Sequence, residues 1–256
     1  MKISRIFTVT LGSLVLAACT QTTEQNAKPQ EKHSHWGYTG HESPEHWGEL
    51  SPKFRICGEG KNQSPVNITN AIDGKLSPIK MDYHPSNVEV VNNGHTIQVD
   101  FKDTTNVLQF EGKSYTLKQF HFHVPSENHI KGKSFPFEAH FVHADAQGNL
   151  AVVGVLYELK GDNQRLAPIW KNLPSKAGEK YTLETAFDPA TLIPKKRDYY
   201  RFNGSLTTPP CSEGVNWLVL KNYDTIGQAQ VDAFSALMHG NNNRPIQPIN
   251  SRVIVE

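Results

Sequence analysis

Long apolar runs are missing from this sequence of 256 residues, and no stretch has enough uninterrupted hydrophobic side chains to span a bilayer as a mature helix. An excess of charge is missing too, because 26 lysines and arginines stand against 25 acidic residues. A net charge near zero gives no indication of nucleic acid as a partner. Internal repeats and signs of a second domain are also absent. With 37% hydrophobic residues, the chain can bury a real core and is expected to form one large domain.

Residues 1–18 have the features of an export signal. Lys2 and Arg5 supply a positive region, and Ile6–Ala18 is a short apolar run that ends in small residues. The run is too short, and too soon followed by polar sequence, to be a stop-transfer helix. We therefore expect an exported protein, located in the periplasm.

Leu16-Ala17-Ala18-Cys19 resembles the lipobox of bacterial lipoproteins, which implies cleavage before Cys19 and lipidation of its sulfur. Several acyl chains on one cysteine would meet the two-signal requirement for stable membrane anchoring. Thr20, rather than Asp, follows the cysteine, which in such lipoproteins favours the outer membrane. Residues 19–34 would then be the lipidated cysteine and a polar, flexible tether. An ordinary secretory signal cleaved near Ala18 is the alternative.

Cysteine is scarce as well, since the chain has only Cys57 and Cys211 besides Cys19. In an exported protein such a pair is expected to form a disulfide. It would close a loop of roughly 150 residues and contribute at most about 5 kcal/mol to stability. Cys211 directly follows Thr207-Thr-Pro-Pro210, so the crosslink would hold that loop in place. Free buried thiols are the alternative, which an oxidising compartment disfavours.

Beyond the tether the chain consists mostly of short, alternating apolar runs separated by Gly, Asn and Pro, which predicts a β-rich domain with peripheral helices and long ordered loops. Only Asn163–Asn172 and Gln228–His239 have the periodicity of helices, and the second is expected to cover the sheet. The expected strands are Val88–Val91, Thr96–Phe101, Val107–Phe110, Ser114–Val124, Glu138–Ala144, Ala151–Glu158 and Trp217–Leu220.

Gln119-Phe-His-Phe-His-Val-Pro-Ser-Glu127 is the stretch around which the rest of the chain is organised. Because side chains alternate along a strand, His121 and His123 share one face and the phenylalanines fill the other. Phe137–His143 alternates in the same way and would bring His140 alongside on an adjacent antiparallel strand. Three neutral imidazoles leave zinc one open position, which is typical of a catalytic site. Taken alone, each of these histidines could instead be an exposed or core residue that binds no metal.

The two histidine strands belong to a larger ordered set of motifs. The others are His35-Trp-Gly-Tyr38, Asn62-Gln-Ser-Pro-Val-Asn67, Asn93-Gly-His95, Gly204-Ser-Leu-Thr-Thr-Pro-Pro210, Val215-Asn-Trp217 and Asn243-Arg-Pro-Ile-Gln-Pro248. Taken in this order, from about His35 to Val255, the set resembles the α-class carbonic anhydrases. The resemblance implies one mainly β domain at 35–256, with a central, mostly antiparallel, ten-stranded sheet and the metal at the bottom of a cone-shaped cleft. Cys57 and Cys211 match the disulfide positions of exported bacterial members.

The resemblance also implies a zinc enzyme that hydrates carbon dioxide to bicarbonate and a proton through zinc-bound hydroxide. His121, His123 and His140 would hold one Zn²⁺ per chain. Gln119 and Glu138, two positions from ligands on the same faces, would orient the rings as outer partners. The middle ligand would use a backbone carbonyl near Asn242.

Thr207 and Glu127 match the pair that orients the hydroxide. A carboxylate only accepts hydrogen bonds, so the Thr207 hydroxyl must donate to Glu127 and can only accept from the hydroxide. The backbone N–H of Thr207 would contact the developing charge. Without the resemblance, Glu127 would be interpreted as a surface carboxylate. The positions that match the substrate pocket are Val142, Val152, Leu206, Thr208 and Trp217, of which the apolar four could equally be ordinary core.

His95 matches the proton shuttle, for which an imidazole with an ordinary pKa near 6.5 is suited. Taken alone it would be merely an exposed histidine. Tyr38, Asn93 and Gln98 would line the polar side of the cleft and organise its water. The resemblance has departures, because Phe202 and Val124 stand where many animal relatives carry tyrosine and tryptophan.

Three other interpretations remain open. His121-x-His-x-x-x-Glu127 fits half of a cupin motif, in which the glutamate is itself a metal ligand. A carbonic-anhydrase-like binding module without activity would lack a ligand, whereas every expected ligand is present here. A zinc-scavenging lipoprotein would use the histidines near the mature start, which are His33, His35, His41 and His46. We expect a monomer or homodimer that acts on a small molecule.

Overall fold

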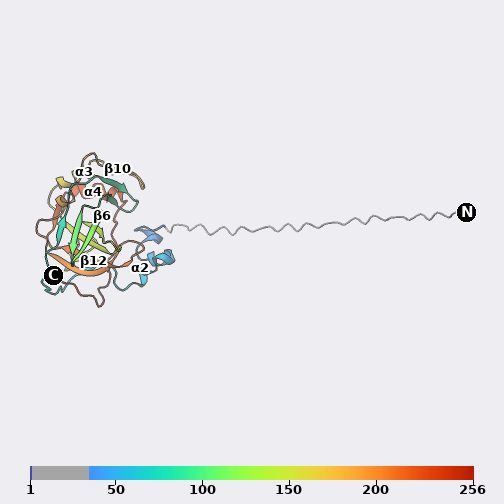
Figure 1. The fold of residues 1–256 in the computed structure, drawn as a ribbon, viewed down its shortest axis with the longest axis horizontal. Helices are drawn as coiled ribbons and strands as arrows, with labels where there is room; N and C mark the ends of the chain where they lie inside the picture. The colour runs from blue at the N-terminus through green and yellow to red at the C-terminus, as the bar shows by residue number, and fades with distance from the viewer. Residues whose placement is uncertain (2–34) are drawn as a thin grey trace. The chain divides into compact units, whose positions relative to one another are not determined.

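A twisted sheet of eleven strands forms the centre of the protein in the computed structural model, which describes Met1 and residues 35–256 (Figure 1). The predicted signal peptide after Met1, the predicted lipidation site Cys19 and the tether at 19–34 lie outside the described residues. Residues 35–256 all fall within one compact unit. Among the described residues, no helix combines the length and the apolar character that crossing a bilayer requires.

Eight strands follow one another across the main path of the sheet, and three more pair beside it. The path runs β10 (Lys180–Thr182), β3 (Val88–Asn92), β4 (Ile97–Phe101), β6 (Lys113–His123), β8 (Phe137–Ala144), β9 (Leu150–Leu159), β12 (Glu213–Leu220) and β11 (Tyr199–Ser205). The others are β13 (Asp224–Ile226) on β9, and β2 (Lys80–Asp82) on β5 (Val107–Phe110), which itself pairs with β6. A separate parallel pair joins β1 (Asn67–Ile68) to β7 (His129–Ile130).

The predicted β-rich fold, with a mostly antiparallel sheet and short helices at its edges, is confirmed. Only β9 makes parallel pairs within the sheet, with β12 and with β13. Each predicted strand lies within a strand of the structure or within a residue of its ends. The sheet has eleven strands rather than the ten that the resemblance implied, because three-residue segments at its margins, such as β2 and β13, also pair.

The two faces of β6 show how the sheet separates core from site. Phe120 and Phe122 are fully buried, and the Phe120 ring lies 5.1 Å from that of Phe141 on β8, centroid to centroid. Removing one such ring would cost about 3–5 kcal/mol of stability. Gln119 and His121 alternate with these phenylalanines and therefore emerge on the opposite face. A rigid, well-packed strand thus carries the polar side chains of the site.

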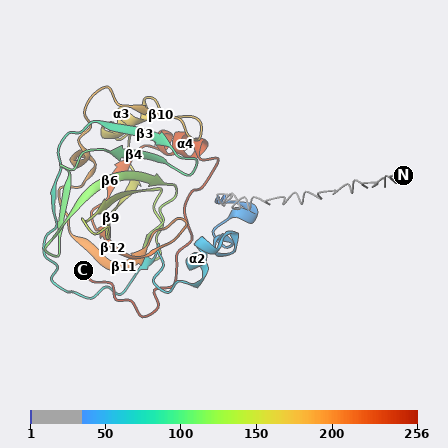
Figure 2. The same ribbon diagram turned by 45° about the vertical axis from the view of Figure 1, so that its right-hand side comes forward.

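Helices are short and lie at the margins, with α3, α4 and β10 gathered at one end of the sheet (Figure 2). In α4, Val231 and Phe234 are buried, and the Phe234 ring packs edge-on against Phe137, which confirms the predicted covering role. The helices are α1 (Trp47–Leu50), α2 (Ile56–Glu59), α3 (Ala167–Trp170) and α4 (Gln228–Leu237), and the 3-10 turns are η1 (Gly40–Glu42), η2 (Pro52–Phe54), η3 (Gln164–Leu166) and η4 (Pro189–Leu192).

Candidate active site

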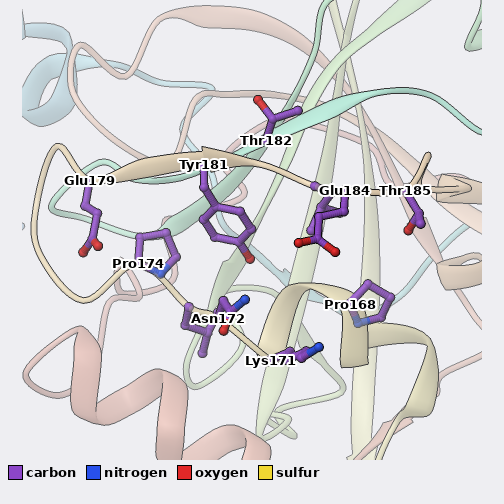
Figure 3. Close-up of a pocket in the computed structure, with 11 residues that line it drawn as sticks. Pro168, Lys171, Asn172, Pro174, Glu179, Tyr181, Thr182, Glu184 and Thr185 are labelled. Atoms are coloured by element: carbon purple, nitrogen blue, oxygen red, sulfur yellow. The ribbon is translucent and has the colours of Figure 1, made fainter.

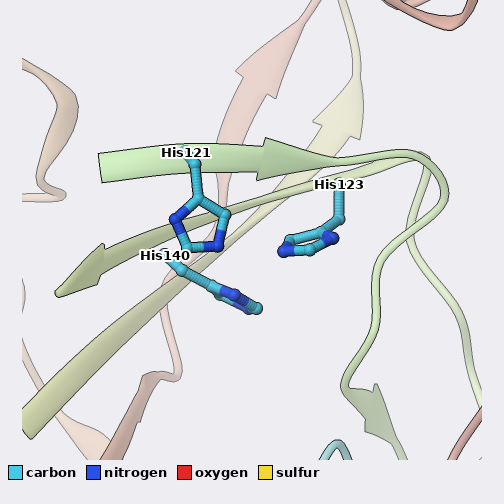
Figure 4. A group of neighbouring side chains, drawn as sticks. All are labelled: His121, His123 and His140. Atoms are coloured by element: carbon cyan, nitrogen blue, oxygen red, sulfur yellow. The ribbon is translucent and has the colours of Figure 1, made fainter. Parts of the chain in front are cut away.

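Three histidines meet where β6 and β8 pair. His121 stands directly opposite His140 in the antiparallel register, and His123 lies two residues further along β6. One ring nitrogen of each lies within 4.8 Å of the corresponding nitrogens of the other two, the arrangement of a candidate metal site (Figure 4). The alternation of β6 and the position of β8 beside it therefore bring together the three residues that the sequence singled out.

Two of the imidazoles have a hydrogen-bond acceptor at their other nitrogen, and the third lies close to a carboxylate. His121 Nδ1 lies 2.8 Å from Gln119 Oε1, and His123 Nδ1 lies 2.8 Å from the carbonyl oxygen of Asn242. A carbonyl can only accept, so the proton of His123 must sit on Nδ1 and leave Nε2 bare. His140 Nε2 makes a close polar contact, 3.0 Å, with Glu138 Oε1. The predicted outer partners Gln119, Glu138 and the Asn242 carbonyl thus lie next to the three rings.

The three rings fit a zinc ion. His123 Nε2 is buried and has no hydrogen-bond partner among the described residues, and a bound cation would coordinate its lone pair. Burial lowers the pKa of all three rings, and the neighbouring imidazoles lower those of His121 and His140 further. The rings are consequently neutral and able to coordinate. Three nitrogen donors with space for one more ligand match a catalytic zinc centre.

Glu127 lies fully buried beside the three histidines, in the loop after β6. Its Oε1 accepts the backbone N–H of Arg244 at 2.8 Å, and its Oε2 lies 3.5 Å from His123 Nε2. Burial raises the pKa of Glu127 well above its usual value, while the Arg244 N–H and a hydrogen bond from the Thr207 side chain act in the opposite direction. The Thr207 side chain therefore lies close enough to act on Glu127, and the orienting role of the pair stays a prediction.

Glu138 connects the Glu127 loop to the third imidazole. Its carboxylate accepts the backbone N–H groups of Glu127 and Asn128 at 2.8 and 2.9 Å, and the Asn128 side chain at 2.8 Å. Burial raises the pKa of Glu138, and these donors oppose the shift. One buried carboxylate thus binds the backbone of the Glu127 loop and lies 3.0 Å from the ring of His140.

A disulfide holds the loop that carries Thr207. Cys57 of α2 is bonded to Cys211, with the two Cα atoms 5.1 Å apart and a separation of 154 positions in sequence. The predicted disulfide is thereby confirmed. Cys211 also donates its backbone N–H to the carbonyl of Thr208 at 2.9 Å. The crosslink and the turn hydrogen bond together restrain the segment immediately after Thr207.

The polar side of the site is a cavity of about 100 Å³ that His121 and His123 line together with the predicted proton-path residues Tyr38, Asn93, His95 and Gln98, and with Thr208. Asn93 donates to Gln98 Oε1 at 3.3 Å, so two of these side chains are linked. The Tyr38 hydroxyl is buried and has no hydrogen-bond partner among the described residues.

His95 is held by a neighbour that the sequence did not indicate. Its ring stacks on Trp36, with centroids 3.6 Å apart and planes inclined by 9°. Burial lowers the pKa of His95, and the nearby His35 lowers it further. The ordinary pKa assumed for His95 from the sequence is therefore corrected downward. Exposed His35 itself lies 3.0 Å from Glu42.

The four apolar residues predicted for the substrate pocket pack together in one hydrophobic cluster, and none of them lines the 100 Å³ cavity. Val152 and Trp217 are buried in one cluster, against which the partly exposed Val142 and Leu206 pack. The Trp217 indole contacts the His140 ring edge-on, with centroids 4.8 Å apart. Phe202, one of the two departures, stacks on Trp217, and Val124 is buried in the large core.

A larger cavity of about 700 Å³ lies apart from this chemistry, along β10 and the chain after α3 (Figure 3). Its walls include Lys171, Glu179, Tyr181 and Glu184, and none of the predicted site residues. The histidine group therefore lies at the smaller of these two cavities.

Comparisons with known proteins agree with the geometry. The sequence profile of the eukaryotic-type carbonic anhydrase family matches residues 42–256. A carbonic anhydrase of Neisseria gonorrhoeae is 56% identical over 96% of this chain and 96% of its own length, and one of Pectobacterium carotovorum is 46% identical over 86% and 90%. A solved structure, the α-carbonic anhydrase of Thermovibrio ammonificans with the inhibitor sulfanilamide, has a TM-score of 0.85 at 46% identity and covers 87% of this chain and 99% of that one.

Proposed function

The chain belongs to the α-class carbonic anhydrases and is an enzyme of that family, and we propose that it hydrates carbon dioxide reversibly at the three-histidine centre. The observation that carries this proposal is the set of bare ring nitrogens that converge within 4.8 Å of one another while the opposite nitrogens face acceptors. Carbon dioxide and bicarbonate are the substrates that family membership implies.

His121, His123 and His140 would hold one zinc ion per chain. Bound zinc supplies a Lewis acid that makes water a usable nucleophile near neutral pH, as it does in carbonic anhydrases generally. Gln119, the Asn242 carbonyl and Glu138 keep the ligating nitrogens deprotonated and directed inward.

Thr207 and Glu127 orient whatever occupies the position next to the metal. Glu127 accepts from Thr207, so the Thr207 oxygen presents a lone pair to the cavity and favours partners that can donate a proton. The backbone N–H of Thr207 stabilises negative charge that develops on the substrate, and Thr208, which lines the cavity, helps to bind bicarbonate or water.

Val142, Val152, Leu206 and Trp217 receive carbon dioxide. The molecule is apolar, so a wall of aliphatic and aromatic groups beside His140 provides an entry that does not compete for hydrogen bonds. The polar residues of the 100 Å³ cavity lie around His121 and His123 and hold water there.

His95 carries the released proton to solvent, by way of water ordered by Tyr38, Asn93 and Gln98. Its lowered pKa favours the neutral ring, which is the form that accepts a proton. The Trp36 stack holds the ring at the rim of the cavity.

Residues 1–18 act as a secretory signal, and Cys19 anchors the enzyme to the outer membrane within the periplasm. The Cys57–Cys211 disulfide supports export, because disulfides persist in oxidising compartments. The enzyme works as a monomer or homodimer without nucleic acid.

Stopped-flow acidification of a carbon dioxide solution by the mature domain, with and without a chelator, tests the proposed function. Rapid acidification that the chelator abolishes and added zinc restores is expected. Sulfanilamide, which is the inhibitor bound to the Thermovibrio ammonificans enzyme, is expected to inhibit it too. A metal-loaded protein that leaves the uncatalysed rate unchanged would contradict the proposal.

A further inference from the structure

Arg244 is buried next to the catalytic loop, and its side chain does not point into the cavity. Only 1% of its surface is exposed. Nη1 donates to Gln63 Oε1 at 2.9 Å and to the carbonyl of Ser64 at 2.8 Å, and Nη2 donates to the carbonyl of Cys57 at 2.8 Å. Arg244 therefore ties the C-terminal segment to the residues around the disulfide.

The backbone N–H of Arg244 contacts a different residue from those bound by its side chain. The Arg244 N–H donates to Glu127 Oε1 at 2.8 Å. No helix or strand includes this segment, since α4 ends at Leu237, so the direction of this N–H is not set by a regular hydrogen-bond pattern. Asn242 anchors the chain on one side of Arg244, through hydrogen bonds to β6 and the residue after it, and Gln247 anchors the other by donating to the carbonyl of Pro65. Between these two points, the guanidinium of Arg244 itself holds the backbone N–H that donates to Glu127 in place.

Gln63 closes a ring of contacts. Its Nε2 donates to the carbonyl of Cys211 at 3.0 Å, while its Oε1 accepts from Arg244. Cys211 belongs to the loop that carries Thr207, and the Thr207 side chain interacts with the Glu127 carboxylate. Thr207 and Glu127 are thus joined twice, once directly and once through Cys211, Gln63 and Arg244.

We propose that Arg244 and Gln63 are positioning residues for the Thr207–Glu127 pair, which together set the distance and direction between the threonine hydroxyl and the carboxylate. Neither side chain touches substrate. Because guanidinium groups donate in a planar fork, Arg244 reaches three acceptors in fixed directions, which an ammonium group on a flexible stem does not reproduce. The proposal goes beyond the proposed function and depends on it only where binding or turnover is the readout.

Arg244→Lys is the informative variant, and Arg252→Lys is its matched control. Arg252 lies in the same C-terminal segment and caps the carbonyls of Ile249, Asn203 and Pro248 with its guanidinium, but it does not touch Glu127. Both substitutions keep the positive charge and remove a planar guanidinium group that donates to carbonyl oxygens. Gln63→Met, which leaves Arg244 two of its three acceptors, serves if Arg244→Lys does not fold.

Binding of two inhibitors separates positioning from general damage. Sulfanilamide carries an N–H that can donate to Thr207, whereas thiocyanate has no proton. If Glu127 no longer fixes the threonine hydroxyl, we expect the Kd of sulfanilamide to rise at least about fivefold in Arg244→Lys and the Kd of thiocyanate to stay constant or fall. We also expect kcat to fall at least about tenfold. In Arg252→Lys all of these values should stay within about twofold of wild type.

Amide hydrogen exchange on the purified protein provides a readout that needs no activity. The amide of residue 244 should exchange at least about ten times faster in Arg244→Lys than in wild type, and at an unchanged rate in Arg252→Lys. Unchanged protection in Arg244→Lys, or equal weakening of both inhibitors, would overturn the inference. A wild-type protein that does not hydrate carbon dioxide would instead contradict the proposed function, and the exchange rates would still decide the role of Arg244.

Discussion

His121 and His140 face each other across the pairing of β6 with β8. This one register decides whether the three imidazoles converge. Because side chains alternate with a period of two, a slip of a single residue would turn His140 to the opposite face, away from His121 and His123. The aromatic packing beneath, including Phe120 against Phe141, holds the register in place.

Replacing any of the three imidazoles should remove the metal. We expect His121→Ala, His123→Ala and His140→Ala each to lower bound zinc from about one ion per chain to a small fraction, and hydration by more than about a hundredfold, because two protein ligands hold zinc poorly. Metal analysis and stopped-flow rates provide the measurement. His84→Ala, which removes an exposed ring near Asp82, should change neither value. Full zinc content in any of the three variants would show that the replaced residue is not a ligand.

Glu127→Gln should separate positioning from metal binding. The amide group can donate, so it no longer forces the Thr207 hydroxyl to accept from the cavity. We expect zinc content to be retained and kcat to fall by about 10²–10³, the range found when a preorganised catalytic contact is lost. The exposed Glu111, which pairs with Arg201, provides the control variant Glu111→Gln. Loss of zinc in Glu127→Gln would favour the cupin-like interpretation, in which this carboxylate is a ligand.

His95→Ala should slow turnover several-fold in dilute buffer while zinc content stays intact. The acceptor of the proton must be the neutral ring, and burial lowers the pKa of His95, so the shuttle-dependent part of kcat should have its midpoint below pH 6.5. Imidazole buffer should restore the lost rate. His41→Ala, which removes an exposed ring outside the cavity, is the control. Turnover equal to wild type in dilute buffer would remove His95 from the proton path.

The alternation of β6 and β8 was sufficient to predict the strands, their faces and the three clustered histidines. Segments of three residues were not predictable in this way. β10 and β13 are too short to show a period, and they exist because β3 and β9 offer them unpaired edges. β11 was also missed, since Tyr199–Ser205 mixes polar and small residues and derives its stability from pairing with β12. The helix expected at Asn163–Asn172 is a 3-10 turn followed by the short α3.

The site residues on strands were predictable from their spacing along the chain. The contacts between loops that are distant in sequence were less predictable. Arg244 stood in a motif that matched the family, but its residue type gave no sign that it would be buried against Cys57, 187 residues away in sequence. Trp36 likewise belonged to a recognised motif, and only the folded chain shows that its ring stacks on His95. Each contact joins two segments that are distant in sequence, and the periodicity of a strand or helix does not predict such contacts.

His143 should make stability depend on pH without taking part in the reaction. Its ring faces the core from β8, is fully buried, and lies 2.6 Å from the hydroxyl of Tyr83. Burial lowers the pKa of His143 to about 4. Above pH 6.5 the ring is neutral in the folded and unfolded states alike, so it contributes no pH dependence. Between pH 6.5 and 4 only the unfolded state takes up the proton, and the folded state loses about 3 kcal/mol in relative stability.

Urea unfolding of wild type and His143→Gln at pH 7 and pH 4.5 measures this contribution. The glutamine side chain can hydrogen-bond Tyr83 but does not titrate, so the free energy of unfolding of wild type should fall by about 2–3 kcal/mol more than that of the variant. Tyr83→Phe removes the same hydrogen bond and leaves the imidazole in place, and it should therefore keep the steep pH dependence of wild type. Parallel losses in wild type and His143→Gln would mean that a different group takes up the proton on acid unfolding.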